Sequence, residues 1–204
     1  MDETLDYDRG TINISDVNGQ LICSQMYPEA ISRTSYARTV DGGAEWGITA
    51  MPTPGKSNEG SSFATKRMDS PVVSKDACLF TSSFTLRVTI PEGATLRYTT
   101  DGTTPTDTNG EISTSGRFMV RTTTVFRFRL FQDGYLPSRV VTRSYIYKDR
   151  EYDLPIVSIV TDPLNLYDDS LGIYVKGVNG RTGNGQSTPC NWNMDWDRPV
   201  NVEY

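Results

Sequence analysis

The sequence predicts a mainly β protein of sandwich type, and three observations carry this prediction. Apolar and polar residues alternate in short stretches such as 96–100 and 126–130, and alternation with a period of two half-buries a strand. Turn residues are frequent, with 17 glycines and 11 prolines in 204 residues. Hydrophobic residues make up only 36% of the chain, which favours many short strands joined by turns over long helices.

Four short strands are expected within residues 1–58. The first two flank Asn18-Gly19, a dipeptide typical of tight hairpin turns, so they should form a hairpin. The stretch 52–58 is rich in proline and glycine and should end the last of the four. The four strands are expected at 11–15, 21–27, 35–38 and 46–49. Residues 59–70 are polar with little periodicity, so we expect a linker there.

The strongest strand signals fall within residues 71–148. Asp101-Gly102 and Asp133-Gly134 supply the positive φ that a tight turn requires, and Pro105 pushes Thr104 toward an extended conformation. The strands are expected at 84–90, 96–100, 122–131 and 140–147. One core between two sheets is expected to take up Leu96, Tyr98, Phe126, Phe128 and Leu130.

Residues 149–204 change in character. The apolar run 154–160 predicts a strand that is buried on both faces, and Asp162-Pro163 predicts the start of a short helix through Leu166-Tyr167. Further strands are expected at 172–175 and near 200–202. Because unpaired strand edges invite association, this block is expected either to lean on the middle sandwich or to pair with a neighbouring chain.

Composition excludes several classes of chemistry. The chain has no histidine, which removes Ser-His, Cys-His and His-zinc sites. Cys23, Cys78 and Cys190 lie far apart and predict neither a metal knuckle nor a disulfide framework; the first two are expected to be buried and the third to lie near the surface. No basic run indicates a nucleic-acid partner, and no apolar run approaches the ~20 residues of a membrane span.

The candidate reactive groups have simple structural interpretations. Carboxylates pair at Asp168-Asp169 and at Asp195 with Asp197, but their spacing does not suit a hard cation. The segment 107–111 lacks the ligand pattern of a calcium loop and predicts a solvated turn. Arg127 and Arg129 are expected on the solvent face of their strand. A flexible loop without phosphate-binding spacing is expected around Gly177, Gly180, Gly183 and Gly185.

Five aromatic residues are candidates for stacking on sugar rings. Large aromatic side chains more often anchor sandwich cores and interfaces, so packing is the expected role. The five are Trp46, Trp192, Trp196, Tyr98 and Tyr135.

Three regions resemble known families. Residues 71–148 resemble the immunoglobulin-like C-terminal domain of chitobiase and β-hexosaminidase proteins, through 96–102, 104–106, 123–125, Asp133-Gly134 and 145–147. Residues 1–58 resemble the closing half of a lamin-tail-type sandwich, through 35–38, Asp41-Gly42, Glu45-Trp46 and 53–58. Residues 149–204 resemble the entry of CotH-type kinases, through 154–158, 161–166, 172–175 and 196–200.

These resemblances imply a non-catalytic role. We expect a partial lamin-tail-like sandwich at 1–58, a linker at 59–70, a complete sandwich at 71–148 and a truncated CotH-like start at 149–204. The expected function is a spacer and docking module of a larger bacterial surface or secreted protein, outside the cytoplasm. Its expected partners are the adjacent domains of the parent polypeptide, with a cell-surface glycan or protein as a further candidate.

Two alternatives stay open at this point. One is carbohydrate binding through exposed aromatic side chains, and the other is an accessory part of the nucleotide lobe of a CotH-like kinase. No residue is assigned a catalytic, metal-binding or cofactor-binding role, and no cofactor is expected, because the kinase residues that the resemblance implies would lie beyond Tyr204.

Overall fold

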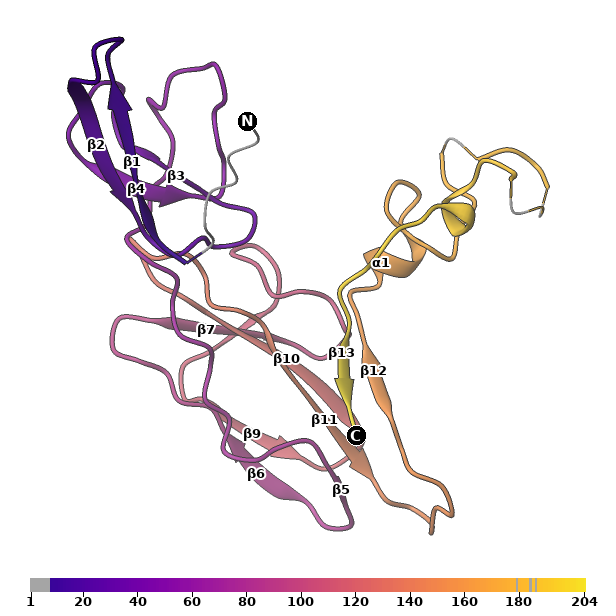
Figure 1. The fold of residues 1–204 in the computed structure, drawn as a ribbon. Helices are drawn as coiled ribbons and strands as arrows, with labels where there is room; N and C mark the ends of the chain where they lie inside the picture. The colour runs from indigo at the N-terminus through magenta and orange to yellow at the C-terminus, as the bar shows by residue number, and fades with distance from the viewer. Residues whose placement is uncertain (1–7, 179, 184, 186) are drawn as a thin grey trace. The chain divides into compact units, whose positions relative to one another are not determined.

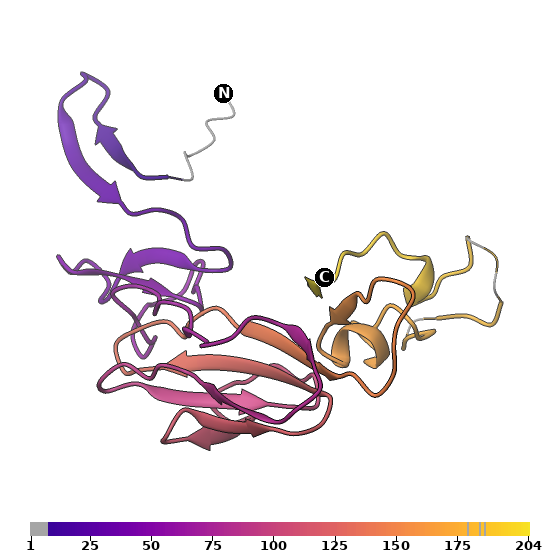
Figure 2. The same cartoon turned by 90° about the horizontal axis from the view of Figure 1, so that it is seen from below.

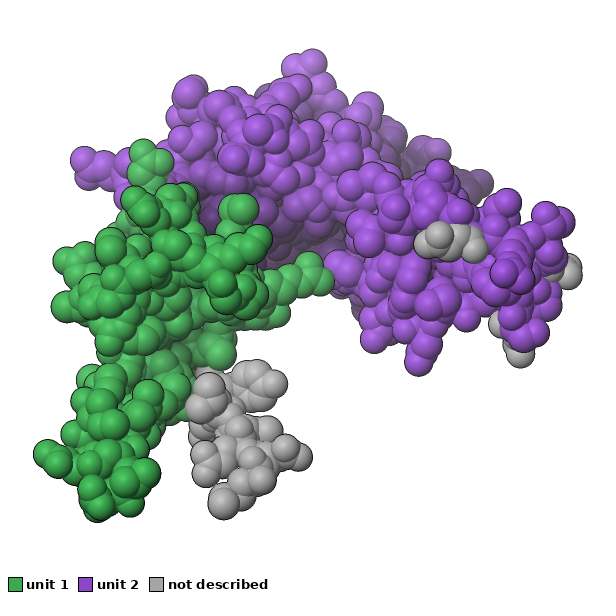
Figure 3. Space-filling view, turned by 90° about the horizontal axis from the view of Figure 1, so that it is seen from above, with its two compact units in different colours: residues 1–67, 133–136 green, residues 68–132, 137–204 purple. Residues whose placement is uncertain are grey.

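The computed structural model describes residues 8–178, 180–183, 185 and 187–204 (Figure 1). The chain divides into two units, coloured separately in Figure 3. Unit 1 comprises residues 1–67 with 133–136, and unit 2 comprises residues 68–132 with 137–204. No helix in the described part of the chain is long and apolar enough to cross a membrane.

Unit 1 contains two hairpins, of which the first was expected. Strand β1 (Gly10–Ser15) pairs antiparallel with β2 (Leu21–Tyr27), and β3 (Ser35–Arg38) pairs antiparallel with β4 (Trp46–Thr49). The turn between β1 and β2 is held by the Asp16 carboxylate, which accepts the backbone N–H groups of Asn18 and Gln20. A small core forms around Ile48, Ala64 and Leu136. The predicted strands of this region are therefore confirmed.

Asn58 explains the polar motif that follows β4, through both its side chain and its backbone. Its amide nitrogen donates to the carbonyl of Arg38 at 2.8 Å, and its backbone N–H donates to the Asp41 carboxylate at 3.0 Å. The Thr53 hydroxyl donates to the amide oxygen of the same side chain. Asn58 thus ties the loop 52–58 back to the end of β3.

Unit 2 contains the sandwich, whose strands stack in layers in Figure 2. The larger sheet has the order β5-β11-β10-β7-β8, and β6 pairs with β9 in the second sheet. Neighbouring strands of the larger sheet are antiparallel except β5 and β11, which are parallel. The strands are β5 (Cys78–Phe80), β6 (Phe84–Arg87), β7 (Thr95–Thr99), β8 (Glu111–Ser113), β9 (Arg117–Val120), β10 (Thr124–Phe131) and β11 (Val141–Tyr147).

The core between the two sheets is aromatic and aliphatic, as predicted. Phe128 is fully buried; its ring centroid lies 5.2 Å from that of Phe118 and 5.3 Å from that of Phe126. Leu96 and Leu130 are also buried and lie directly opposite each other on β7 and β10. Tyr98 is half-buried, and its ring packs edge-on against Phe118. The five residues predicted to form this core therefore do so.

One glycine is required by the packing of this sandwich. Gly116 has a φ of 60°, and a Cβ atom added there would lie 2.2 Å from the carbonyl oxygen of Val88. Its close approach lets the backbone N–H of Val88 donate to the carbonyl of Gly116 at 2.8 Å. Any side chain at this position would break the contact.

The C-terminal part of unit 2 differs from two sequence predictions. Strand β12 (Ser158–Val160) covers only the end of the apolar run, and its Ile159 is 69% exposed, so burial on both faces is wrong. Residues 172–175 form turns and no strand, because the backbone N–H groups of Ile173 and Tyr174 donate to carbonyls at Asn165 and Leu166. The remaining elements are α1 (Leu164–Tyr167), the 3₁₀ turn η1 (Asn191–Asn193) and β13 (Asn201–Glu203).

The cysteine predictions are also corrected. Cys190 was expected near the surface but is only 4% exposed, while Cys23 and Cys78 are half-buried. The amide nitrogen of Asn193 bonds the carbonyls of Gly185 and Thr188 and the Cys190 sulfur, which folds this stretch over the thiol. All three cysteines are free thiols.

Candidate functional site

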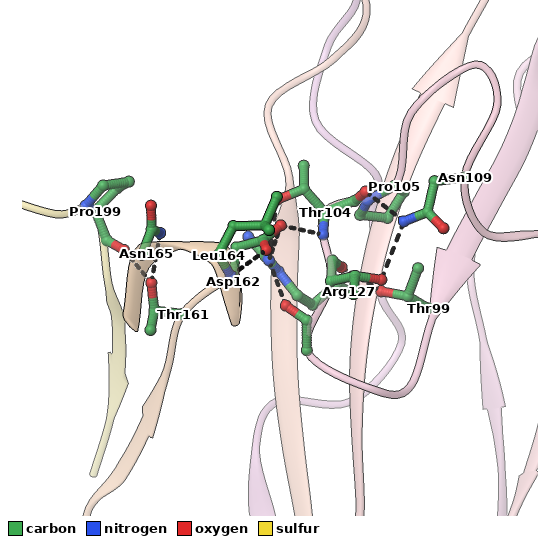
Figure 4. Close-up of polar contacts among 12 residues, drawn as sticks. Thr99, Thr104, Pro105, Asn109, Arg127, Thr161, Asp162, Leu164, Asn165 and Pro199 are labelled. Carbon is green, nitrogen blue, oxygen red and sulfur yellow. Dashed lines mark hydrogen bonds and ion pairs between the residues drawn. The ribbon is translucent and has the colours of Figure 1, made fainter. Parts of the chain in front are cut away.

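The main polar cluster of unit 2 begins with Arg127 on β10. Arg127 was expected to face solvent, but its side chain is only 13% exposed. Its guanidinium donates to the carbonyl of Gly102 at 2.7 Å and to the hydroxyl of Thr104 at 3.1 Å. The prediction is wrong because the loop after β7 and the segment after β12 cover this position (Figure 4).

The loop after β7 is held in shape by its own polar side chains. The Thr99 hydroxyl donates to the carbonyl of Thr103, and the Asp101 carboxylate accepts the hydroxyl and the backbone N–H of Thr103. These bonds from Thr103 lower the pKa of Asp101 below 3.8. The Asn109 amide donates to the carbonyl of Thr104 at 2.9 Å, and Gly102 has the positive φ expected of the turn.

Asp162 joins the segment after β12 to this loop. Its carboxylate accepts the backbone N–H of Thr104 at 2.7 Å and lies 3.9 Å from the Arg127 guanidinium. It also accepts the backbone N–H of Leu164 at 3.1 Å, at the start of α1. We call the group formed by Thr104, Arg127 and Asp162 the Asp162 latch.

The electrostatics of the latch favour an ionised carboxylate. Burial opposes ionisation of Asp162, but the hydrogen bonds from Thr104 and Leu164 and the charge of Arg127 outweigh it and hold the pKa below 3.8. Burial also lowers the pKa of Arg127, which the charges of Asp162 and Asp101 counteract. With the side chain of Asp162 only 15% exposed, the ion pair is shielded from solvent.

A second polar contact joins β13 to the sandwich. The Glu203 carboxylate accepts the backbone N–H of Ser144 on β11 at 2.8 Å and lies 3.7 Å from the Arg143 guanidinium. The hydroxyls of Ser144 and Ser158 are hydrogen bonded at 2.7 Å. Strands β12 and β13 pair antiparallel, so both strands of this ribbon are attached through their inward-facing side chains.

Buried donors without a partner accompany these polar contacts between ribbon and sandwich. Among the described residues, the buried side-chain nitrogens without a hydrogen-bond partner in the chain are Arg127 Nε, Arg143 Nε and Asn201 Nδ2. All three lie on strands that form the interface. Each unpaired buried donor costs about 1–3 kcal/mol. The interface therefore fixes the position of the ribbon on the sandwich but adds little to the free energy of unfolding.

The two carboxylate pairs lie in a turn and at the surface. Asp168 accepts the backbone N–H groups of Ser170 and Leu171 and so holds a turn, while Asp195 and Asp197 are exposed. The described part of the chain contains no group of three or more side chains arranged to bind a metal ion. The segment 107–111 is a largely exposed turn, as predicted. In the glycine-containing loop, residues 179, 184 and 186 lie outside the described residues.

Most of the candidate sugar-stacking rings already have neighbours. In unit 1, Trp46 stacks on Tyr36 at 5.3 Å and has Arg38 4.8 Å from its ring centroid. Arg198 lies 4.8 Å from the ring centroid of Trp196, and Lys66 lies 5.8 Å from that of Tyr135. Only Trp192, at 43% exposed, departs from the predicted packing role.

Each unit also has a cavity. In unit 1 a space of about 540 Å³ lies between the β1–β2 and β3–β4 hairpins and is lined by Ile12, Ile14 and Trp46 among others. In unit 2 a groove of about 420 Å³ lies beside β5 and β11, with Ile146, Ile156 and Tyr204 in its walls. Neither holds a set of converging reactive groups.

The comparisons with known proteins identify the middle of the chain. Residues 79–142 match the family model of the chitobiase/beta-hexosaminidase C-terminal domain. The match runs from β5 to the start of β11 and includes the loop of the Asp162 latch. No curated protein matches the chain. The family match does not extend to residues 1–58 or 149–204, so the lamin-tail and CotH resemblances stay predictions.

Sequence reasoning missed the latch for an identifiable reason. Arg127 alternates with Phe126 and Phe128, which is the pattern of an exposed strand face, and its acidic partner follows 35 positions later. Asp162 was predicted at the start of a helix, where it does bond the N–H of Leu164. A second role for the same carboxylate leaves no local signal in the sequence.

Proposed function

We propose that this chain is a non-catalytic docking module, in which the chitobiase C-terminal-type sandwich fixes the position of the segment that follows it. The observation that carries the proposal is the Asp162 latch, because it joins a loop of the sandwich to the first residues after β12 through a shielded ion pair and a 2.7 Å hydrogen bond. The Glu203 contact supports it at the other strand of the ribbon.

An interface of this kind fixes the orientation of the ribbon relative to the sandwich. Two carboxylates must each meet specific donors, so only one placement of the ribbon satisfies both Asp162 and Glu203. The sequence resemblances extend the proposal: the parent is a bacterial surface or secreted protein in which the sandwich presents a CotH-like kinase domain. The lamin-tail-like region is then a further module of the same polypeptide.

We do not propose carbohydrate binding as the main function. The name of the matched family makes sugars a natural candidate ligand, but the rings of Trp46 and Trp196 are already in contact with arginine side chains. Titration calorimetry with chitin oligosaccharides should give no sub-millimolar binding. Sub-millimolar binding that is lost on changing Trp192 to Ala would favour the carbohydrate function instead. An accessory role in a nucleotide lobe stays a prediction.

Backbone ¹⁵N relaxation tests the docking function. In the unchanged chain, amides of β12 should report the same overall tumbling as amides of β10. In the double variant Asp162→Ala with Glu203→Ala, β12 should tumble faster than β10 because the ribbon is released. The matched control Asp169→Ala with Asp195→Ala changes two exposed carboxylates and should leave β12 unaffected. Independent tumbling of β12 in the unchanged chain would refute the proposal.

A further inference from the structure

Strand β1 of unit 1 has one free edge among the described residues. It pairs with β2 on one side, and no other described strand pairs with it (Figure 1). Five of its six residues are exposed, including Ile12 at 40% and Ile14 at 55%. The free edge of a strand presents a row of backbone N–H and C=O groups that a further strand can pair with. A two-stranded ribbon is only marginally stable on its own, so an added strand would stabilise it.

The sequence of β1 lacks the features that normally keep a free edge from pairing. Natural proteins shorten such strands, or place charged residues or proline in them. The sandwich of unit 2 follows this rule, since β5 and β8 have three residues each, while β6 and β9 contain Arg87 and Arg117. Strand β1 has six residues, Gly10–Ser15, and none of them is charged or a proline. Its free edge is therefore open to pairing.

The edge of β1 is more regular than the edge of β2. The register of the hairpin shifts between Ile14 and Ser15, and the extra residue, Ile22, lies on β2. A bulge of this kind bends and twists its strand and interrupts the ladder of hydrogen bonds. Strand β1 is therefore the side of the hairpin on which a regular ladder can form.

The residue pattern of β1 is complementary to itself. Ile12 and Ile14 share one face of the strand, and Thr11, Asn13 and Ser15 share the other. A two-fold axis normal to the sheet at Asn13 would pair all of residues 11–15 with a second copy and set each isoleucine opposite an isoleucine. A shift of this register by one residue would turn the second hairpin over, so that isoleucines would meet polar residues.

We propose that the free edge of β1 is a self-association surface, on which a second copy of the chain pairs antiparallel through its own β1 with the two-fold axis at Asn13. The two hairpins then form one four-stranded sheet of order β2-β1-β1-β2. One face of this sheet carries four adjacent isoleucines, two from each copy, and such apolar cross-strand pairs stabilise a sheet. The residues involved lie in unit 1, so the inference does not depend on the Asp162 latch in unit 2.

The size of the contact predicts how tightly the copies associate. Five paired residues give a contact about 17 Å long, and one sheet layer is about 10 Å thick. The contact is therefore much smaller than the roughly 800 Å² that each partner buries in a stable complex. We expect a reversible dimer with a dissociation constant between about 10 μM and 1 mM.

Sedimentation equilibrium of the 204-residue chain and three variants tests this inference. Asn13→Lys would set two lysines opposite each other at the axis and should raise the dissociation constant about threefold to fivefold. The matched control is Ser24→Lys, because Ser24 lies opposite Asn13 on β2 and takes the same charge away from the free edge. It should leave the dissociation constant unchanged. An equimolar mixture of Asn13→Lys and Asn13→Asp should associate more tightly than either variant alone.

Three results would overturn the inference. The first is a chain that stays monomeric up to about 1 mM, the upper end of the expected range. The second is a dimer that Asn13→Lys leaves unchanged, or that Ser24→Lys weakens equally, because another surface would then hold the copies together. The third is a mixture of the lysine and aspartate variants that associates no better than each alone, because Asn13 would then not meet its own counterpart.

Discussion

Removing the carboxylate of the Asp162 latch should loosen the β12–β13 ribbon by an amount that the geometry defines. Asp162→Ala leaves the Thr104 N–H without an acceptor, at about 1–3 kcal/mol, and leaves Arg127 without its nearest charge. Two unit charges about 4 Å apart attract by about 4 kcal/mol at an effective dielectric of 20, much of which desolvation offsets. We therefore expect a total loss of about 2–4 kcal/mol.

Native-state hydrogen exchange of β12 measures this loss, since local opening of the ribbon exposes its amides. A loss of 2 kcal/mol corresponds to about 30-fold faster exchange. Asp162→Asn keeps an acceptor oxygen for Thr104 and should lose only about half as much. In the background of Arg127→Met the effect of Asp162→Asn should shrink further, which measures the coupling of the ion pair. Exchange in Asp162→Ala within about twofold of the unchanged chain would refute the reasoning.

Three other predictions follow from the sandwich and its edges. Phe128→Ala should lower the free energy of unfolding by about 3–5 kcal/mol in urea titrations, while Met119→Ala, at an exposed position on β9, should change it by less than about 0.5 kcal/mol. The Tyr98 hydroxyl donates to the Glu111 carboxylate, which raises the pKa of Tyr98 from 10.0 to about 12. The folded chain thus holds this proton more tightly than the unfolded chain, so the stabilisation is complete below pH 10 and is lost as the pH rises toward 12; the stability difference from Tyr98→Phe should shrink across that window. Finally, amides of β12 should exchange faster than those of β10, and equal protection in a verified monomer would mean that the C-terminal block stabilises itself.

The sandwich was predictable because its signals are local. Alternation in β7 and β10 fixes which side chains face inward, and the pairing of these neighbouring strands then places Phe128 opposite Tyr98 and Leu130 opposite Leu96. Asp101-Gly102 and Asp133-Gly134 set the turns in the same way, because the positive φ of each glycine is a property of two adjacent residues. No long-range information is needed for these elements.

The C-terminal block was less predictable because its burial depends on partners far along the chain. The apolar run 154–160 has the composition of a doubly buried strand, yet the side chain of Ile159 is 69% exposed. Cys190 shows the opposite error: its neighbours Pro189 and Asn191 indicate surface, but the Asn193 amide closes the chain over it. In both cases the tertiary contacts override the local pattern.

A pH titration of Asp162 by NMR tests the docking of the ribbon on the sandwich most directly. Because its pKa is lower in the folded than in the unfolded chain, the latch should be complete above pH 3.8 and be lost as the pH falls through the folded value. The carboxyl carbon of Asp162 should therefore titrate below 3.8, and the amide proton of Thr104 should shift with the same midpoint as its acceptor is protonated. A carboxyl that titrates at its ordinary value, with a Thr104 amide that does not follow it, would contradict the account.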